Sequence, residues 1–150
     1  MDLDTLLNKN QKEAATYLDS HLRIIAGAGS GKTRVVTYRI AHLIQDVGID
    51  PHSILAITFT NKAANEMKER VNEVVGIHGS GTLICTIHSL CVRFLRQHIN
   101  VLNYPSNFTI MDEEDQKALI KKLYTQLEID AKVISIKSMI NTISSYKTAR

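Results

Sequence analysis

Residues 22–33 read LRIIAGAGSGKT, an apolar run that leads into a loop of small residues. The apolar run, Leu22–Ala26, contains two adjacent isoleucines and predicts a short buried strand. The segment from Ala26 to Thr33 matches the pattern GxxxxGK(S/T), with Ala26 in place of the first glycine. Apolar side chains then recur at helical spacing over residues 32–47, which predicts a helix. The stretch therefore predicts a strand, a phosphate-binding loop and a helix in direct succession.

The chemistry of this loop points to a nucleoside triphosphate with Mg²⁺. Glycines let several backbone N–H groups converge on one anion, and the helix start adds the positive end of its dipole. In such loops the lysine reaches the β- and γ-phosphates and the next hydroxyl binds Mg²⁺, which predicts catalytic roles for Lys32 and Thr33 and a metal contact for Thr33. The other predicted phosphate-binding residues are Ala26, Gly27, Ala28, Gly29, Ser30 and Gly31. A glycine-rich turn without a ligand is the alternative, and the strand and helix on either side argue against it.

Predicted strands and helices alternate along the next part of the chain. Ile54–Thr58 (ILAIT) and Leu83–Ile87 (LICTI) are apolar runs that predict buried strands, and helical patterns cover residues 62–75 and 88–99. A further helix is predicted upstream, over residues 8–20. Because each predicted strand is apolar on both faces, the pattern predicts an α/β fold with a parallel sheet covered by helices.

The pattern becomes helical toward the end of the chain. Residues 108–111 (FTIM) predict one last short strand. Asp112, with Asp115 three residues later, predicts the cap of the helix that follows, and Ser135 predicts the cap of the last helix.

Length and composition are those of an ordinary globular domain. The chain has 150 residues and a formal net charge of +3, and no apolar run approaches the roughly 18 residues of a membrane span. Cys85 and Cys91 suggest no disulfide framework, and we expect them to be small core side chains in a reducing, cytoplasmic compartment. We expect residues 1–111 to form one unit and residues 112–150 to begin a second. The last predicted helix reaches Arg150 without a glycine or proline stop signal, which is typical of a piece of a longer chain.

Acidic residues are absent from Val74 to Met111, and four acids follow at residues 112–115. The acid-free stretch contains Arg93, Arg96 and three of the six histidines. Two interpretations of this charge distribution stay open. The acids are absent by chance and the basic residues lie on a solvated helix face, or the stretch forms a surface that faces phosphates.

Three further segments indicate which kind of phosphate-loop protein this is. They are LNKNQKEA at residues 7–14, LAITFTNKAANEM at residues 55–67 and TIHSLC at residues 86–91. Together with AGAGSGKT they resemble the N-terminal part of superfamily 1 DNA helicases of the PcrA/UvrD/Rep type, in the same order and over essentially the whole chain. The resemblance implies an incomplete RecA-like P-loop NTPase domain, followed by the start of an all-helical insertion subdomain. It also implies an ATP-dependent DNA helicase or translocase of 3′-to-5′ polarity, with ATP, Mg²⁺ and single-stranded DNA as ligands.

The resemblance extends the nucleotide site by two residues. Gln11 is similar to the glutamine that reads the adenine edge, and a carboxamide offers the donor and the acceptor that this needs. A solvated glutamine at a helix start is the alternative. Arg34 follows Lys32 and Thr33 as in the family, and it either reaches the nucleotide or lies on the helix surface.

The resemblance also implies a single-stranded DNA site at the ends of two strands, formed by Thr58, Phe59, Thr60, Asn61, Thr86, His88 and Ser89. Hydroxyls and an amide suit contacts to phosphate and sugar. Phe59 either stacks on a base or is a core side chain. Without the resemblance, His88 would be interpreted as a helix-capping or core histidine. Ile87 stands where the family usually has phenylalanine, and we expect it to pack inward.

Parts of a complete helicase are missing from the sequence. No apolar strand ends in the acidic pair that would anchor Mg²⁺ and activate water, because Asp112–Asp115 fits a capped helix better. The arginines that stabilise the transition state would come from a second RecA-like domain in the remainder of the helicase chain. We therefore expect these residues alone to bind ligands without competent ATP hydrolysis. The alternatives are a nucleotide-binding module without DNA function, a small-molecule kinase, and part of a related helicase–nuclease.

Overall fold

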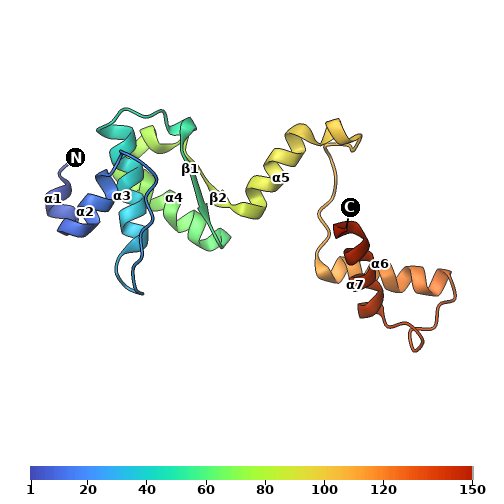
Figure 1. The fold of residues 1–150 in the computed structure, drawn as a ribbon. Helices are drawn as coiled ribbons and strands as arrows, with labels where there is room; N and C mark the ends of the chain where they lie inside the picture. Colours follow the sequence, from blue (N-terminus) through green and yellow to red (C-terminus); the bar gives the residue numbers. More distant parts are fainter. Residues whose placement is uncertain (150) are drawn as a thin grey trace. The chain divides into compact units, whose positions relative to one another are not determined.

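The computed structural model describes residues 1–149, which divide into two compact units. The first unit, Met1–Ile99, combines a two-stranded sheet with helices, and the second begins at Asn100 and is helical. Figure 1 shows the elements of the first unit, which are α1 (Leu3–Leu6), α2 (Lys9–Thr16), α3 (Lys32–Gln45), η1 (Pro51–Ser53), β1 (Leu55–Thr58), α4 (Asn61–Val75), η2 (Gly76–Gly79), β2 (Leu83–Thr86) and α5 (Ile87–His98). After η3 (Ile99–Leu102), the second unit contains α6 (Glu113–Gln126) and α7 (Ile136–Thr148).

The sheet consists of two parallel strands connected by α4. Leu55 pairs with Leu83 and Thr58 with Thr86, so both strands end at the same edge of the sheet. A parallel pair needs a crossover connection, and the helix between the strands provides it. The predicted parallel pairing of the two apolar runs is therefore confirmed.

The core of the first unit lies between α3, α4 and β2. On α4 the buried residues recur three or four positions apart, so the helical period gathers them on one face. This face packs against α3 and against Ile84 of β2, whose side chain is 2% exposed. The cluster consists of Ile40, Ala41, Ala64, Met67, Val71, Val75 and Ile84.

A second, smaller cluster attaches α1 and α2 to α3. Leu3 and Leu7 from α1 and the turn after it, Ala15 from α2 and Val35 from α3 are all buried. Ala15 is completely buried, because its small side chain allows the backbones of α2 and α3 to approach closely. This packing brings the first helices alongside the helix that follows the predicted phosphate loop.

The helices of the second unit begin where the sequence predicts. The Asp112 carboxylate accepts hydrogen bonds from the backbone N–H groups of Glu114 and Asp115, both at 2.8 Å, and the Asp115 side chain accepts one from the Asp112 N–H. The Ser135 hydroxyl accepts a bond from the Ser138 N–H at 3.2 Å. Both predicted caps are therefore confirmed, and the acids at residues 112–115 open a helix.

The predicted strand at Leu22–Ala26 is wrong. These residues are irregular and exposed, and Ile25 keeps 85% of its surface accessible. A strand forms when a neighbouring strand completes its hydrogen-bond ladder. Among residues 1–149, the sheet contains only β1 and β2, and the apolar run at 22–26 pairs with neither of them.

The predicted strand at residues 108–111 is also wrong, because these residues too pair with neither β1 nor β2. This segment is irregular, and Ile110 and Met111 are about half exposed. The predicted helix over residues 8–20 is confirmed as α2 but ends at Thr16, because Tyr17 has extended backbone angles.

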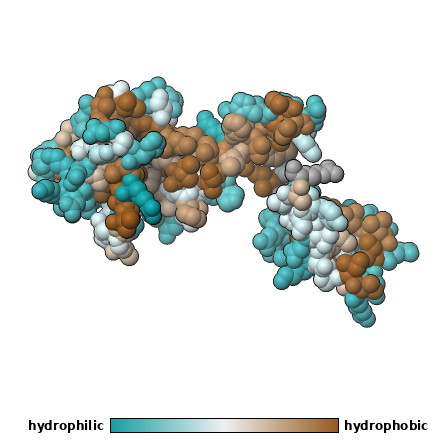
Figure 2. All heavy atoms as spheres, viewed as in Figure 1, coloured by the Kyte–Doolittle hydropathy of each residue, from teal (hydrophilic) through white to brown (hydrophobic). Residues whose placement is uncertain are grey.

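Apolar side chains at the surface contradict three further expectations. Leu55 and Ile57 on one face of β1 are about half exposed, although both faces of the strand were expected to be covered. Ile87 is 49% exposed instead of packing inward, and Cys91 is exposed while Cys85 is half-buried. Figure 2 shows hydrophobic residues on the visible surface of both units. Apolar runs in the sequence therefore predicted β1 and β2, but not which other parts of the protein cover them.

The helices of residues 1–149 give no candidate for a membrane span, since none is both long enough and apolar enough.

Candidate functional site

The loop at residues 26–31 turns through two glycines with left-handed backbone angles. Gly29 has φ of 76° and Gly31 has φ of 83°, a region that L-residues with a side chain rarely adopt. At Gly31 an added Cβ would also lie 2.8 Å from Nε2 of Gln11. The left-handed backbone therefore favours glycine at both Gly29 and Gly31. At Gly31 the nearby Gln11 side chain also leaves little space for a Cβ.

The helix that follows this loop starts without a side-chain cap. In each of the other six α-helices of residues 1–149, a side-chain oxygen accepts a hydrogen bond at the N-terminus; the capping residues are Asp2, Asn8, Thr60, Thr86, Asp112 and Ser135. The N-cap of α3 is Gly31, which has no side chain to offer. The first N–H groups of α3 therefore lack an acceptor where the helix dipole is positive, and an anion would supply one.

Lys32 folds its ammonium back over the same loop. Nζ donates to the carbonyl oxygens of Ala26 at 3.2 Å and Gly27 at 2.7 Å. The Ser30 hydroxyl also donates to the Gly27 carbonyl, at 2.8 Å. An ammonium has three N–H donors, so one remains for a further acceptor beside the loop. Thr33 lies in the first turn of α3, and its side chain is exposed.

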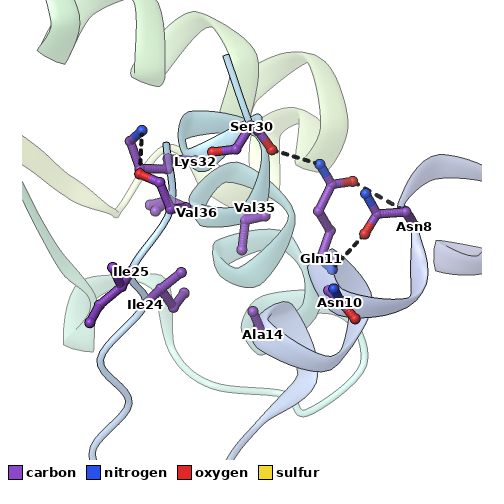
Figure 3. Close-up of a pocket in the computed structure, with 11 residues that line it drawn as sticks. Asn8, Asn10, Gln11, Ala14, Ile24, Ile25, Ser30, Lys32, Val35 and Val36 are labelled. Atoms are coloured by element: carbon purple, nitrogen blue, oxygen red, sulfur yellow. Dashed lines mark hydrogen bonds between the residues drawn. The ribbon is translucent and has the colours of Figure 1, made fainter. Parts of the chain in front are cut away.

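Gln11 connects α2 to the loop. Its Oε1 accepts a hydrogen bond from the Asn8 N–H at 3.1 Å, and Asn8 Oδ1 accepts one from the Gln11 N–H at 2.9 Å, which is a complete capping box. Its Nε2 donates to the Ser30 carbonyl at 3.0 Å, as Figure 3 shows. The carboxamide keeps one further donor and one further lone pair. Gln11 is therefore a helix-start residue, as the alternative proposed, and still has the groups that an adenine edge needs.

A pocket of about 440 Å³ lies between α2, the segment before the loop, and α3. Its size is within the range of small-molecule sites, roughly 300–1,000 Å³. Figure 3 shows Gln11, Ser30 and Lys32 together with the apolar side chains around this pocket. The lining residues are Asn8, Asn10, Gln11, Ala14, Ile24, Ile25, Ala26, Ser30, Lys32, Val35 and Val36. The apolar wall and the polar loop together suit a ligand with a flat apolar part and an anionic part.

Arg34 lies away from this pocket. Its Nη2 donates to the Leu6 carbonyl at 2.8 Å, and its guanidinium lies over the Tyr38 ring, 5.7 Å from the centroid. Helical geometry explains this, because Arg34 is two residues from both Lys32 and Val36, which line the pocket, and so projects from the other side of α3. The structure therefore does not bring Arg34 together with the loop residues, and its contact with a nucleotide remains a prediction.

The second group of candidate residues lies at the carboxyl edge of the sheet. Thr58 and Thr86 are register partners at the ends of β1 and β2, so the two predicted segments meet there. The helices α4 and α5 both start at this edge, capped by Thr60 and Thr86. The Thr86 hydroxyl accepts from the Ser89 N–H at 3.2 Å and lies 2.9 Å from the Ser89 hydroxyl.

Phe59 is the most exposed of the large apolar residues in the described part of the chain, with a relative exposure of 102%. The interpretation of Phe59 as a core side chain is therefore wrong. His88 is exposed and the cap of its helix is Thr86, so a core or capping role for His88 is also wrong. Asn61 is exposed in the first turn of α4. The edge thus presents an aromatic ring, an imidazole and an amide to solvent.

The sequence patterns did not identify Arg39, whose side chain lies between α2 and α3, the two helices on either side of the pocket. Its guanidinium reaches from α3 to the C-terminal end of α2. The available signal was spacing, because Arg39 follows Lys32 by seven residues, which is two helical turns, and so lies on the same face.

Residues 7–150 match the UvrD/REP helicase N-terminal domain, and the chain belongs to this helicase family. It is 48% identical over 141 residues to the "ATP-dependent DNA helicase PcrA" of Bacillus subtilis (strain 168) and 46% identical over 141 residues to that of Staphylococcus aureus (strain Mu50). The PcrA of Staphylococcus epidermidis is likewise 46% identical over 141 residues. In each case the alignment covers 94% of this chain and 19% of the relative, so the chain spans about a fifth of the length of the curated relatives it matches.

Proposed function

We propose that the chain binds ATP with Mg²⁺ at residues 26–33 and single-stranded DNA at the carboxyl edge of the sheet. In this proposal it is the N-terminal part of an ATP-dependent DNA helicase that moves in the 3′-to-5′ direction in the cytoplasm. The observation that carries the nucleotide half is the start of α3, which lacks a side-chain cap and has a lysine folded over the adjoining loop. Membership of the helicase family supports the DNA half.

The residues of the loop fit a triphosphate. The free N–H groups at the start of α3 would donate to phosphate oxygens, and the third N–H of Lys32 would do the same. Thr33 would supply a hydroxyl ligand to Mg²⁺, which when bound neutralises phosphate charge. Lys32 is already held by the Gly27 carbonyl, so its ammonium is positioned before the ligand arrives.

The apolar side of the pocket fits the base of the nucleotide. Ile24 and Ile25 line this wall across from Val35, and Gln11 lies between the wall and the loop. The remaining donor and acceptor of Gln11 would pair with the adenine edge. Base and phosphates would thus be recognised by two different elements, α2 and the loop.

The edge formed by β1 and β2 fits single-stranded DNA. The ring of Phe59 is free to stack on a base, an interaction worth about 1–3 kcal/mol in other proteins. Thr58, Thr60 and Asn61 from the first strand end and Thr86, His88 and Ser89 from the second offer polar groups for phosphate and sugar.

Hydrolysis needs more than these residues in our proposal. Within residues 1–149 both strands end in threonine, and the four acids at 112–115 belong to the capped start of α6. We propose that residues 1–111 are the first part of a RecA-like domain and that residues 112–150 begin a helical insertion. A second RecA-like domain would supply the groups that complete catalysis.

Titration with a fluorescent ATP analogue in Mg²⁺ tests the nucleotide site. We expect Lys32→Ala to weaken binding by about tenfold or more, because a hydrogen bond from a charged group is lost. Lys68→Ala on α4 is the control, since this lysine is exposed and lies outside the pocket. Equal affinity of the wild type and Lys32→Ala would contradict the proposed site.

Titration with a short fluorescent oligonucleotide tests the DNA edge. We expect Phe59→Ala to weaken binding by about 1–3 kcal/mol, and binding by the wild type to strengthen as salt is lowered. Phe94→Ala is the matched control, because Phe94 is also exposed but lies on α5 against His98. ATP binding without any DNA binding would favour a nucleotide-binding module instead. Phosphate release by the chain alone at the rate of a complete helicase would refute the proposed need for a second domain.

A further inference from the structure

Arg39 crosses from α3 to the end of α2. Its Nη1 donates to the carbonyl oxygens of Ala14 at 3.2 Å, Ala15 at 3.4 Å and Tyr17 at 2.7 Å. Carbonyls in the last turn of a helix have no partner within the helix, and the negative end of the dipole lies there. A part-buried guanidinium at this position satisfies both requirements, so Arg39 caps α2 from another helix.

The contacts between α2 and α3 follow one another in the same order along both helices. Gln11, near the start of α2, donates to Ser30, just before α3. One turn later, Ala15 lies in the same buried cluster as Val35 of α3. The end of α2 then rests on Arg39. The position of α2 beside the loop is therefore set at its start, its middle and its end.

We infer that Arg39 is a positioning residue for base recognition, because it holds α2 so that Gln11 stands beside the phosphate loop. The inference rests on the proposed ATP site. Helices as short as α2, which has eight residues, are marginal by themselves in water and take their stability from what they pack against. Without the cap, the carbonyls of the last turn would need water, and α2 would fray from the end that Arg39 now holds.

The phosphate half of the site does not depend on this cap. Lys32 and Thr33 are part of α3, and Lys32 is held by the carbonyls of its own loop. Loss of the Arg39 cap should therefore weaken contacts to the base and leave contacts to the phosphates unchanged. A residue that merely supports the fold would weaken both together.

Competition titrations with ATP, GTP and inorganic tripolyphosphate, each with Mg²⁺, test this in the full chain. Arg39→Met removes the donors and keeps an apolar stem. We expect this substitution to lower the affinity for ATP about tenfold, which is the effect of losing charged hydrogen bonds. We also expect it to reduce the preference for ATP over GTP. The affinity for tripolyphosphate should change less than about twofold, within the error of non-additive effects. Arg70→Met, which removes a half-exposed arginine of α4, is the control and should change none of the three.

Two further measurements separate the cap from the nucleotide site. Arg39→Lys should restore much of the ATP preference, because all three carbonyls are bound through one nitrogen and an ammonium has three donors. Without nucleotide, hydrogen exchange of the α2 amides should be faster in Arg39→Met than in the wild type.

Unchanged exchange, an unchanged ATP preference, or equal loss of ATP and tripolyphosphate would each overturn the inference. A wild-type chain that binds neither ligand would refute the proposed ATP site, and the inference with it. A wild type that binds ATP selectively while Arg39→Met keeps that selectivity would refute the inference alone.

Discussion

Alanine substitutions at three glycines of one loop should lower the free energy of unfolding by different amounts. Gly27, Gly29 and Gly31 differ in the two properties that decide what a Cβ does. Gly27 has no left-handed backbone angle and an added Cβ would meet nothing within 4 Å. Gly29 has φ of 76° and open space, whereas Gly31 has φ of 83° and the Nε2 of Gln11 at 2.8 Å.

The magnitudes follow from these differences. A left-handed backbone costs an L-residue about 1–2 kcal/mol, which applies to Gly29→Ala and Gly31→Ala. Gly31→Ala also displaces Gln11 from the Ser30 carbonyl, and a lost hydrogen bond costs about 0.5–1.5 kcal/mol. Loss of unfolded-state entropy stabilises all three variants alike, by about 0.4–1 kcal/mol, so it cancels when they are compared. Compared with Gly27→Ala, we therefore expect the free energy of unfolding to be lower by about 1–2 kcal/mol in Gly29→Ala. In Gly31→Ala we expect it to be lower by about 1.5–3.5 kcal/mol.

Urea unfolding followed by circular dichroism measures these costs as shifts of the midpoint at constant slope. In a Gln11→Ala background, the cost of Gly31→Ala should fall to that of Gly29→Ala, because the clashing atoms are gone. The reasoning is refuted if Gly27→Ala is as costly as Gly31→Ala. It is also refuted if removing Gln11 leaves the cost of Gly31→Ala unchanged.

Three further predictions concern other parts of the first unit. Ile84→Ala should cost about 2–5 kcal/mol in urea unfolding, because its side chain is fully buried; a cost below 1 kcal/mol would contradict the packing of β2 on α4. Phe59→Ala should leave the unfolding midpoint unchanged within about 0.5 kcal/mol, since the ring is fully exposed, and a large loss would show that the ring is packed. The hydrogen bond from His42, followed by that from the Met1 ammonium, holds the pKa of the Asp46 carboxyl below its ordinary value of 3.8. A carboxyl whose pKa is lower in the folded state than in the unfolded state stabilises the fold at pH values above the unfolded-state pKa. This stabilisation is lost as the pH falls through the folded-state pKa. Asp46→Asn should therefore cost up to about 1 kcal/mol at pH 7 and less in strong acid, and a cost independent of pH would refute this.

Local patterns predicted the elements whose stabilising contacts are local. The acids after Met111 were predicted to cap a helix, and Asp112 does so through bonds to N–H groups two and three residues away. The apolar face of α4 followed from spacing, because a helix gathers every third or fourth residue on one side. The pairing of β1 with β2 followed from their alternation with helices.

The errors have a common cause, since each concerns a contact with a segment distant in the sequence. Leu22–Ala26 has the composition of a strand, but a strand needs a hydrogen-bonded neighbour, and this segment pairs with neither strand found among residues 1–149. Ile87 and Cys91 are apolar, yet their burial depends on what lies against α5, which has no fully buried residue. The orientation of Arg34 toward Leu6 could not be foreseen either, because it depends on where α1 lies.

By itself, the sequence determined the family of the chain and the local form of its glycine-rich loop. The pattern AGAGSGKT requires glycines where the backbone is left-handed and a lysine where the helix begins, and both requirements are local. The segments after the two strands indicated the helicase family for the same reason, since they are contiguous residues in a fixed order. Only the tertiary structure decided which residues distant in the sequence lie side by side. It placed Gln11 against Ser30, nineteen residues away, and Arg39 on the end of α2, because α2 and α3 share a buried cluster that includes Ala15 and Val35. Such contacts depend on how helices pack, and helix packing depends on the shapes of all the side chains between them, which no local pattern records.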